Sequence, residues 1–235
     1  MNKLQEYIEK YKQLHDGTTP FYASSEDFEA NKLTVNGENK KFLFDGAQFG
    51  NKFARLIKHC IGKMQRGISL LDYGCGMANH HKIRTTTLDG KLLLEFLDNK
   101  VQCMYNYDPG VEVFKTKPPL GMTFDIVACS DVLEHVPEEY IPVVLAEISN
   151  YTKDNGIMLF TVSVSPGKKK FIDGEYFHIT LKEKDWWLQQ FKNYTNGKSF
   201  YFLYKNKSGE EKIYFNSTTF PFWDEQDMSG GVEFK

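Results

Sequence analysis

The sequence predicts an α/β fold: a mostly parallel β-sheet with helices on both faces, followed by an antiparallel hairpin. Apolar stretches of strand length alternate with stretches in which apolar residues recur at helical spacing, an order typical of sheets covered by helices. The apolar stretches are far shorter than the roughly 18 residues of a membrane span. With 235 residues, 41% of them hydrophobic, the chain can bury a sizeable core in one domain.

The N-terminal region precedes this alternation. Apolar residues recur at helical spacing over residues 2–15 and again over 48–63, so we expect a helix at each place. Between them, "NGEN" at 36–39 can close a hairpin. The first helix is expected to pack on the main domain.

The alternating region supplies the sheet. The expected strands occupy residues 69–73, 101–107, 124–129 and 156–162, and the expected helices occupy 88–98, 138–151 and 182–192. Pro142 falls in or just after the first turn of one of these helices, where its missing N–H costs least. After the last helix, "SFYFLYKN" and "EKIYFNS" alternate apolar and polar residues around Ser208-Gly209, which predicts the hairpin.

Composition and charge indicate the domain organisation, the cellular compartment and the partners to expect. We expect a helix and cap region at 1–50, the main domain at 51–219 and a tail at 220–235. The four cysteines show no CxxC spacing, and the N-terminus lacks the apolar segment of a secretory signal, which together predict a reduced, cytoplasmic protein. The net charge of −2 gives no general attraction to nucleic acid.

A glycine-containing loop follows the first core strand in "SLLDYGCGMANHH". After Asp72, Gly74 and Gly76 permit positive φ and place no Cβ between the main chain and a ligand. Backbone amides there can face a polar group at the carboxyl end of a strand, where open α/β sheets bind ligands. For a GxG pattern alone a plain strand-end turn is the better interpretation, so the other strand ends decide the matter.

Two further strand ends carry polar side chains. Asp108 follows the second strand in "YNYDPG", where its carboxylate can accept hydrogen bonds from the two hydroxyls of a ribose. The third strand runs into "CSDVLEHVPEE" at 129–139. Because parallel strands end at one edge of a sheet, these residues and the glycine loop are expected to converge.

Taken in this order, "LLDYGCG", "YDPG" and "FDIVACSDVLEHVPEEYIPVVLAEI" resemble class I S-adenosylmethionine-dependent methyltransferases over roughly residues 68–217. The segment "DGEYFHITLKEKDWW" is also similar to segments of methyltransferase-like proteins encoded by bacteriophages. The resemblance implies a Rossmann-like fold, S-adenosylmethionine as cofactor and transfer of its methyl group to an acceptor.

The resemblance also implies a cofactor site. In such enzymes the glycine loop lies against the methionine part of the cofactor, the acid after the second strand holds the ribose, and the third strand end lies beside the adenine or the sulfonium. The implied cofactor-binding residues are Asp72, Gly74, Cys75, Gly76, Asp108, Ser130, Asp131 and Val132.

Two spacings depart from the family pattern. Asp108 lies 36 residues after Asp72, against about 20 in a compact dinucleotide-binding unit, which indicates an insertion. Only 17 residues separate Asp108 from Asp125, too few for a helix, a strand and another helix. The third-strand region of the family is therefore expected to be compressed.

Two histidines are candidate general bases. A histidine pKa near neutrality suits proton removal from a hydroxyl or amine acceptor, which directs attention to His135 and His178. A purely structural role is equally compatible with each of them. Glu134 is not expected to orient His135, because neighbouring residues on a helix do not face one another.

Cys75, His80 and His81 are the residues that could suggest a metal. Adjacent histidines point in divergent directions, and no fourth ligand follows at a zinc-like spacing. The sequence therefore gives no reason to expect a metal.

The acceptor is constrained mainly by exclusion. Ser130-Asp131-Val132-Leu133 is not the Asn/Asp-Pro-Pro-aromatic tetrapeptide of amino-methylating DNA enzymes, and no Pro-Cys nucleophile is present, so DNA base methylation is disfavoured. The leading hypothesis is methylation of an O or N nucleophile of a small molecule or glycan. The alternatives are a non-catalytic protein that kept the fold, a nucleic-acid methyltransferase, and a nicotinamide dehydrogenase, which Asn79 at the third glycine position disfavours.

Three segments are expected to shape the acceptor pocket: residues 16–50, 131–137 and 163–180. Lys168, Lys169 and Lys170 read most simply as a solvated loop. If that loop lies over the site, its lysines would attract an acidic acceptor.

Overall fold

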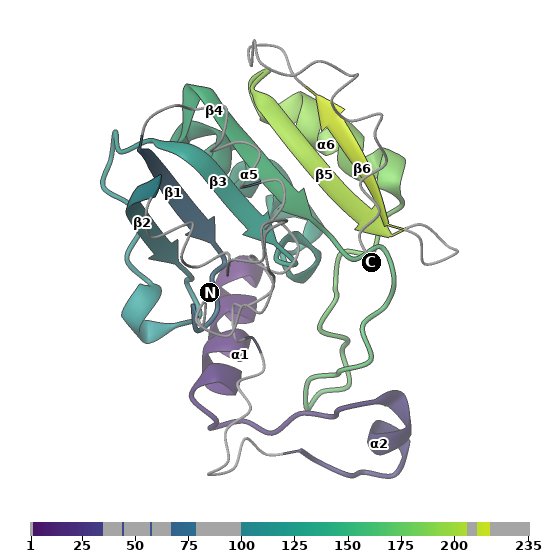
Figure 1. The fold of residues 1–235 in the computed structure, drawn as a ribbon. Coiled ribbons are helices and arrows are strands. Elements are labelled where there is room, and N and C mark those ends of the chain that lie inside the picture. Colours follow the sequence, from purple (N-terminus) through teal and green to yellow (C-terminus); the bar gives the residue numbers. More distant parts are fainter. Residues whose placement is uncertain are drawn as a thin grey trace, which may run out of the picture.

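The computed structural model describes residues 2–34, 44, 57, 67–78, 100–205 and 211–216. They contain a six-stranded sheet in the order β2-β1-β3-β4-β5-β6 (Figure 1). The strands are β1 (Ile68–Tyr73), β2 (Val101–Tyr107), β3 (Phe124–Ser130), β4 (Thr152–Thr161), β5 (Ser199–Lys205) and β6 (Glu211–Asn216). The first five are parallel and β6 runs antiparallel to β5, which confirms the predicted α/β fold with its C-terminal hairpin.

β3 shows why the central strands form where they do. Every residue of β3 except Ser130 is buried, as expected of a strand covered on both faces, and the sequence there is a nearly continuous apolar run. Its one buried charge is compensated, because the Asp125 carboxylate accepts hydrogen bonds from the backbone N–H of Ser69 and from Lys153 Nζ, both at 2.9 Å. The apolar run and this anchor fix β3 against β1 and β4.

β4 begins four residues earlier than expected, at Thr152 instead of Gly156. The glycine and the polar residues before it suggested a turn. In the structure Thr152 already pairs with Phe124, and an irregularity in the pairing between Phe124 and Ile126 absorbs the extra length.

The link between β2 and β3 is short, as the spacing predicted. Residues 108–123 contain a single 3-10 turn, η2 (Glu112–Phe114), and no strand. Within the described part of the chain, β2 is therefore an edge of the sheet, paired only with β1. This confirms the compressed third-strand region.

Two helices cover one face of the sheet. α5 (Ile141–Tyr151) follows a 3-10 turn, η4 (Glu138–Tyr140), so the predicted helix at 138–151 begins with a tighter turn. Pro142 lies in the first turn of α5, as predicted. α6 (Lys184–Tyr194) is the predicted third helix of the region.

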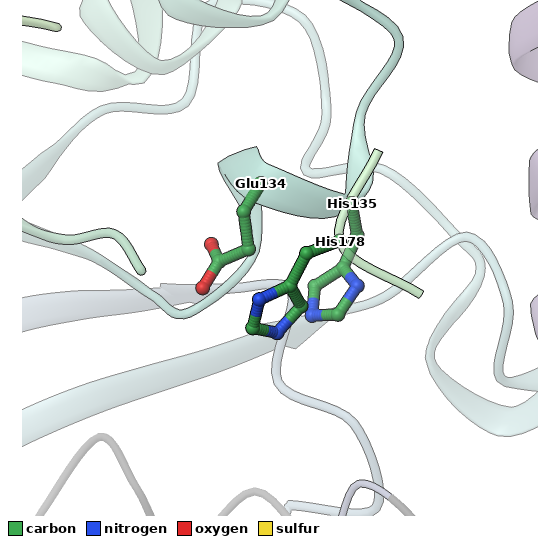
Figure 2. Close-up of side chains that lie close together, drawn as sticks. All are labelled: Glu134, His135 and His178. Atoms are coloured by element: carbon green, nitrogen blue, oxygen red, sulfur yellow. The ribbon is translucent and has the colours of Figure 1, made fainter. Parts of the chain in front are cut away.

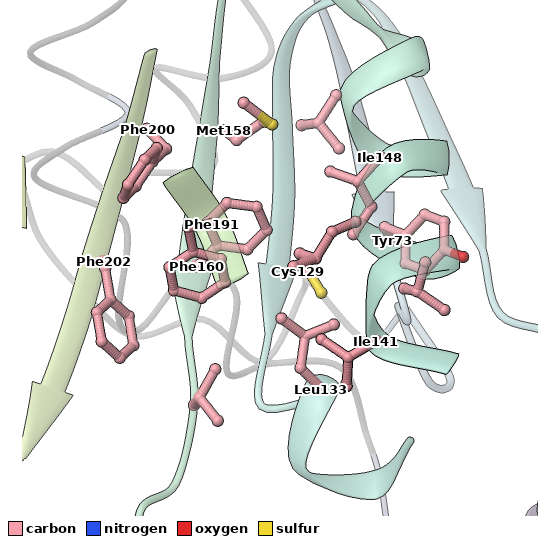
Figure 3. Close-up of a cluster of buried hydrophobic side chains, with 14 of the residues drawn as sticks. Tyr73, Cys129, Leu133, Ile141, Ile148, Met158, Phe160, Phe191, Phe200 and Phe202 are labelled. Carbon is pink, nitrogen blue, oxygen red and sulfur yellow. The ribbon is translucent and has the colours of Figure 1, made fainter. Parts of the chain in front are cut away.

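The main core lies between these helices and the sheet (Figure 3). Phe160 of β4 stacks on Phe191 of α6, with ring centroids 4.4 Å apart and planes 5° from parallel. Trp187 is fully buried in the same core, and Trp186 packs at its rim, which is the packing role expected of the pair. The core thus packs against one face of the sheet and supports the strand ends.

The N-terminal helix lies at the opposite end of the molecule from the strand beginnings. α1 (Lys3–His15) agrees with the predicted helix and starts at Asn2, whose side chain accepts a hydrogen bond from Gln5 N–H. Figure 1 shows α1 at the carboxyl ends of β1, β2 and β3, to which their arrowheads point. A short helix, α2 (Ser25–Glu29), follows it.

α1 is fastened to the segment between β4 and α6. A second apolar cluster joins them, made of Tyr7, Leu14, Phe21, Phe171 and Phe177. At its edge Lys10 Nζ pairs with the Asp173 and Glu175 carboxylates at 2.7 and 2.9 Å. Burial lowers the pKa of Lys10, but the hydrogen bonds to the two carboxylates outweigh it and hold that pKa above its usual range.

Several expectations fall on parts of the chain that the structure does not describe: the hairpin at 36–39, the helix at 88–98, and the helix at 48–63 apart from Ile57, which is helical and buried. Among the helices that are described, none combines the length and hydropathy that crossing a bilayer requires.

Candidate active site

A cavity of about 1450 Å³ lies at the carboxyl ends of β1, β2, β3 and β4. It exceeds the roughly 300–1,000 Å³ of typical small-molecule sites, so it has room for two ligands side by side. Every predicted site residue except Cys75 lines it: Asp72, Gly74, Gly76, Asp108, Ser130, Asp131, Val132, His135 and His178.

The glycine loop is tied to the end of β2. The backbone N–H groups of Gly74 and Cys75 both donate to the Tyr107 carbonyl oxygen, at 2.7 and 3.1 Å. Gly74 has φ +80°, and a Cβ at that position would overlap the Val132 side chain. Glycine is therefore required at 74 both by its backbone conformation and by the close approach of the third strand end.

Asp108 is held by backbone amides on each of its oxygens. Gly76 N–H donates to Oδ2 at 2.9 Å, and Gly110 N–H donates to Oδ1 at 2.8 Å. Each carboxylate oxygen has two acceptor positions, so both remain able to accept a further hydrogen bond on the cavity side. Burial raises the pKa of Asp108, while the Gly110 hydrogen bond and the nearby His15 oppose the rise.

Asp72 lies deeper in the wall, with 2% of its surface exposed. Burial raises the pKa of Asp72 well above its usual range, and the neighbouring Asp108 charge raises it further. Burial and mutual repulsion disfavour the charged forms of these two neighbouring carboxylates. A cationic group or hydroxyl donors would stabilise the charged forms, so this part of the cavity favours such ligands. An ammonium group and a ribose diol have that chemistry.

The third strand end is cross-linked to β4. Asp131 has φ +54°, in the left-handed region that Asp tolerates better than most residues. Its N–H donates to Thr161 Oγ1 at 3.0 Å, and Thr161 Oγ1 donates back to Asp131 Oδ1 at 2.8 Å. This reciprocal pair orients the turn that places Val132 against Gly74.

Beyond that turn, Glu134, His135 and His178 form a side-chain cluster (Figure 2). One nitrogen or oxygen atom of each lies within 4.8 Å of the other two. Glu134 and His135 belong to the 3-10 turn η3 (Leu133–His135), and His178 comes from the 163–180 segment. Glu134 was not expected to orient His135, and the contacts to the His135 Nδ1 come instead from the Tyr11 hydroxyl and the Phe177 carbonyl oxygen.

His135 is uncharged at neutral pH. Burial lowers its pKa to about 4, and the neighbouring His178 contributes in the same direction. Tyr11 of α1 contacts the His135 Nδ1 through its hydroxyl at 2.8 Å. Such a low pKa makes His135 a weak proton acceptor, which weakens the general-base role that the sequence suggested for it.

α1 contributes cavity residues that sequence reasoning missed. Tyr11 and His15, four positions apart on one face of α1, both line the cavity. In the sequence pattern Tyr11 is simply one of the apolar positions of the helix. A phenol hydroxyl and an imidazole on one face of the predicted helix were the signal that could have indicated that this helix covers a site.

The remaining candidate residues fall into three groups: those that line the cavity, one that is buried beneath it, and those outside the described part of the chain. Lys168 and Lys169 line the cavity, so the basic loop does lie beside the site. Cys75 is buried beneath it, and burial raises the pKa of its thiol, which makes the side chain a packing group and a poor nucleophile. His80 and His81 lie outside the described residues.

Comparison with known protein families identifies the type of domain. The family model of a methyltransferase domain matches residues 46–203. Among solved structures, the chain is similar to a coclaurine N-methyltransferase bound to N-methylheliamine and SAH, with 18% identity over 67% of this chain and 53% of that chain and a TM-score of 0.26. The chain thus spans about half of that protein's length. No curated protein matches it. Because the domain match extends over more than half of the chain and includes all three strand ends of the cavity, the protein belongs to the methyltransferase-domain family.

Proposed function

We propose that this protein is an S-adenosylmethionine-dependent methyltransferase that methylates an O or N nucleophile of a small molecule or glycan. The observation that carries the proposal is that Asp72 and Asp108, at the carboxyl ends of adjacent parallel strands, both line one cavity with room for a second ligand. A cytoplasmic location and kinship with bacteriophage proteins belong to the same proposal.

The chain's residues fit the cofactor by their donors and acceptors. Asp108, already held by two amides, would accept hydrogen bonds from the ribose hydroxyls, and Asp72 would pair with the ammonium of the methionine part. Gly74, Cys75 and Gly76 would bring main chain against that part, and Ser130, Asp131 and Val132 would border the sulfonium or the adenine. When bound, S-adenosylmethionine supplies an activated methyl group on a sulfonium.

Methyl transfer then depends mainly on alignment of the acceptor. The part of the cavity beyond Val132 is bordered by His135 and His178, which we propose contact the acceptor. Lys168 and Lys169 add positive charge to the same part, and burial lowers the pKa of Lys169. An acceptor with an acidic group would gain from these lysines.

Calorimetric titration tests the cofactor assignment. Wild-type protein is expected to bind S-adenosylmethionine and S-adenosylhomocysteine but not NAD, and Asp108→Asn is expected to weaken both interactions. Asp154→Asn is the matched control, since the Asp154 side chain is 99% exposed and is not among the residues that line the cavity. Absence of binding to wild type, or equal binding by both variants, would refute the proposal.

A non-catalytic protein that kept the fold is the second candidate, favoured by the compressed link between β2 and β3. Incubating the protein with radiolabelled cofactor and a cell extract separates the two. Label transferred to an extract component supports the enzyme, whereas tight cofactor binding with no labelled product supports the alternative. Label in nucleic acid would instead revive a nucleic-acid methyltransferase.

A further inference from the structure

We infer that Glu134, His135 and His178 form a binding site for a divalent transition-metal ion. The three side chains offer two imidazole nitrogens and one carboxylate oxygen within 4.8 Å of one another (Figure 2). Two histidines and one carboxylate are a recurring ligand set for zinc and for other divalent first-row metals at catalytic sites, where further coordination positions stay open.

The backbone holds the cluster together without a ligand. Glu134 and His135 sit on η3 directly after β3, whose position the core fixes. The Glu134 carbonyl oxygen accepts hydrogen bonds from the N–H groups of Ile179 and Thr180, at 2.9 and 3.1 Å. These bonds tie the loop that carries His178 to the turn that carries the other two residues, so the three side chains start from fixed positions.

The surroundings of His135 leave one ring nitrogen available to a metal. Its Nδ1 lies 2.9 Å from the Phe177 carbonyl oxygen, and a carbonyl oxygen can only accept. When Nδ1 carries the proton and donates it to this carbonyl, Nε2 of the neutral ring keeps its lone pair. A histidine that donates its other N–H to a backbone carbonyl is the usual arrangement around a ligated metal.

His178 repeats this arrangement. Its Nδ1 lies 3.0 Å from the Ser165 carbonyl oxygen, and an Nδ1–H that donates to this oxygen leaves the lone pair on Nε2. A Cβ on Gly167 would lie 3.2 Å from the His178 ring, so the loop packs closely against it. Both histidines thus lie beside a carbonyl acceptor that favours the Nδ1–H tautomer, which leaves Nε2 able to bind a cation.

Glu134 supplies the negative charge. The side chain is fully buried, and its Oε1 accepts a hydrogen bond from Ser163 N–H at 2.9 Å. Coordination to a metal is one of the ways in which proteins accommodate a buried carboxylate. Metal bonds of about 2.0–2.2 Å would draw the three ligand atoms closer than 4.8 Å, and the partly exposed His178 has room for that adjustment.

The site would select the acceptor, an inference that rests on the proposed function. Coordination positions left open by the protein would face the cavity, where a hydroxyl oxygen of the acceptor can bind. The cation would favour loss of the hydroxyl proton to water. The oxygen lone pair then forms the new O–CH₃ bond while the S–CH₃ bond breaks, and its electron pair stays on sulfur. The metal thus points to an oxygen acceptor.

The site is tested by adding Co²⁺ to the full chain after dialysis against a chelator. Wild-type protein is expected to bind one Co²⁺ per chain, with visible absorption bands that Zn²⁺ abolishes by displacement. Glu134→Gln and His178→Ala are each expected to lose this binding. Glu139→Gln and His15→Ala remove the same side-chain types at described positions outside the cluster and are expected to keep it. No saturable binding by wild type, or equal binding by all variants, would overturn the inference.

Proton spectra of the Co²⁺-loaded wild type decide the matter even if the variants fold poorly. Two solvent-exchangeable, paramagnetically shifted signals are expected, one from each Nδ1–H, and their absence contradicts ligation by His135 and His178. Titration with S-adenosylmethionine runs in parallel. Protein that binds the cofactor but not Co²⁺ refutes the metal site alone, and protein that binds Co²⁺ but not the cofactor refutes the proposed function alone.

Tyr11 is a positioning residue of this site. Its hydroxyl contacts His135 Nδ1 at 2.8 Å and donates to the Phe177 carbonyl at 2.8 Å. Tyr11→Phe keeps the ring and removes these contacts, so Co²⁺ affinity is expected to fall by about 10-fold to 100-fold. The visible Co²⁺ spectrum should persist at saturating metal. An unchanged affinity would show that Tyr11 does not orient His135.

Discussion

Asp72 couples the stability of the protein to pH. Its folded-state pKa is raised by burial and by Asp108, so the folded protein holds a proton that the unfolded chain has released. Stability is therefore greatest below the unfolded pKa of about 4 and declines as the pH rises toward the folded pKa.

Asp72→Asn removes this decline. Urea unfolding at several pH values from 5 to 8, without cofactor, should show the variant gaining on wild type as pH rises, by up to about 1.4 kcal/mol per pH unit inside the titration range. Asp154→Asn is expected to change with pH in parallel with wild type, because its carboxylate is exposed. A difference between Asp72→Asn and wild type that stays constant over this range would contradict the assigned shift.

Gly74 offers a second test at single-residue scale. Gly74→Ala adds backbone strain and an overlap with Val132, so a loss of about 3 kcal/mol in unfolding free energy is expected. Gly121 also has a positive φ, +84°, but a Cβ added there would meet nothing within 4 Å, so Gly121→Ala should cost only about 1 kcal/mol. Equal losses would mean that backbone strain alone makes Gly74 necessary.

At the scale of elements, α1 and the 163–180 segment form one cover over the cavity. Lys10→Met removes the ion pairs to Asp173 and Glu175, which should loosen the cover by roughly 1 kcal/mol, since Lys10 is partly exposed. Backbone hydrogen exchange is expected to quicken at Phe171 and Phe177. Lys3→Met, which breaks only the exposed 3.6 Å pair with Glu139, should leave those amides unchanged. Equal exchange in both variants would show that the Lys10 pairs do not hold the cover.

The strands were predictable because their signals are local. β3 reads as a buried apolar run, and the short stretch after Asp108 left no room for another strand. β4 was mispredicted at its start because Gly156 looks like a breaker, while the pairing that lengthens the strand lies on β3.

The part of the cavity at the ends of β1 and β2, which we propose binds the cofactor, followed from the same local signals, whereas the part around His178 did not. The strand ends carrying Asp72 and Asp108 are adjacent because parallel strands end together. His178 lies beside Glu134 because backbone hydrogen bonds join two segments that are far apart in the sequence. No local sequence pattern in either segment predicts these bonds. Glu134 and His135 are neighbours in η3, and both meet His178 because the hydrogen-bonded loop brings it to that turn.

At the scale of the molecule, one core supports every strand end. Phe160 stacks on Phe191 and lies directly behind the cavity wall, so Phe160→Ala should cost about 3–5 kcal/mol of unfolding free energy. Leu120→Ala removes a fully exposed side chain and is expected to change stability by less than about 0.5 kcal/mol. Urea denaturation measures both. A small loss in Phe160→Ala would show that the core relaxes around the missing ring.

The Tyr7 hydroxyl donates a hydrogen bond to Glu175, and the Tyr11 hydroxyl donates one to the Phe177 carbonyl. These contacts join α1 to the 163–180 segment, which the ribosome synthesises much later than α1. The first helix must therefore wait, without these contacts, until the ribosome has released residue 178. β1, β2 and β3 can pair before then. The part of the cavity at the ends of β1, β2 and β3 can consequently form earlier in translation than the part that α1 and the 163–180 segment close. The later contacts are long-range, so they carry the larger loss of loop entropy.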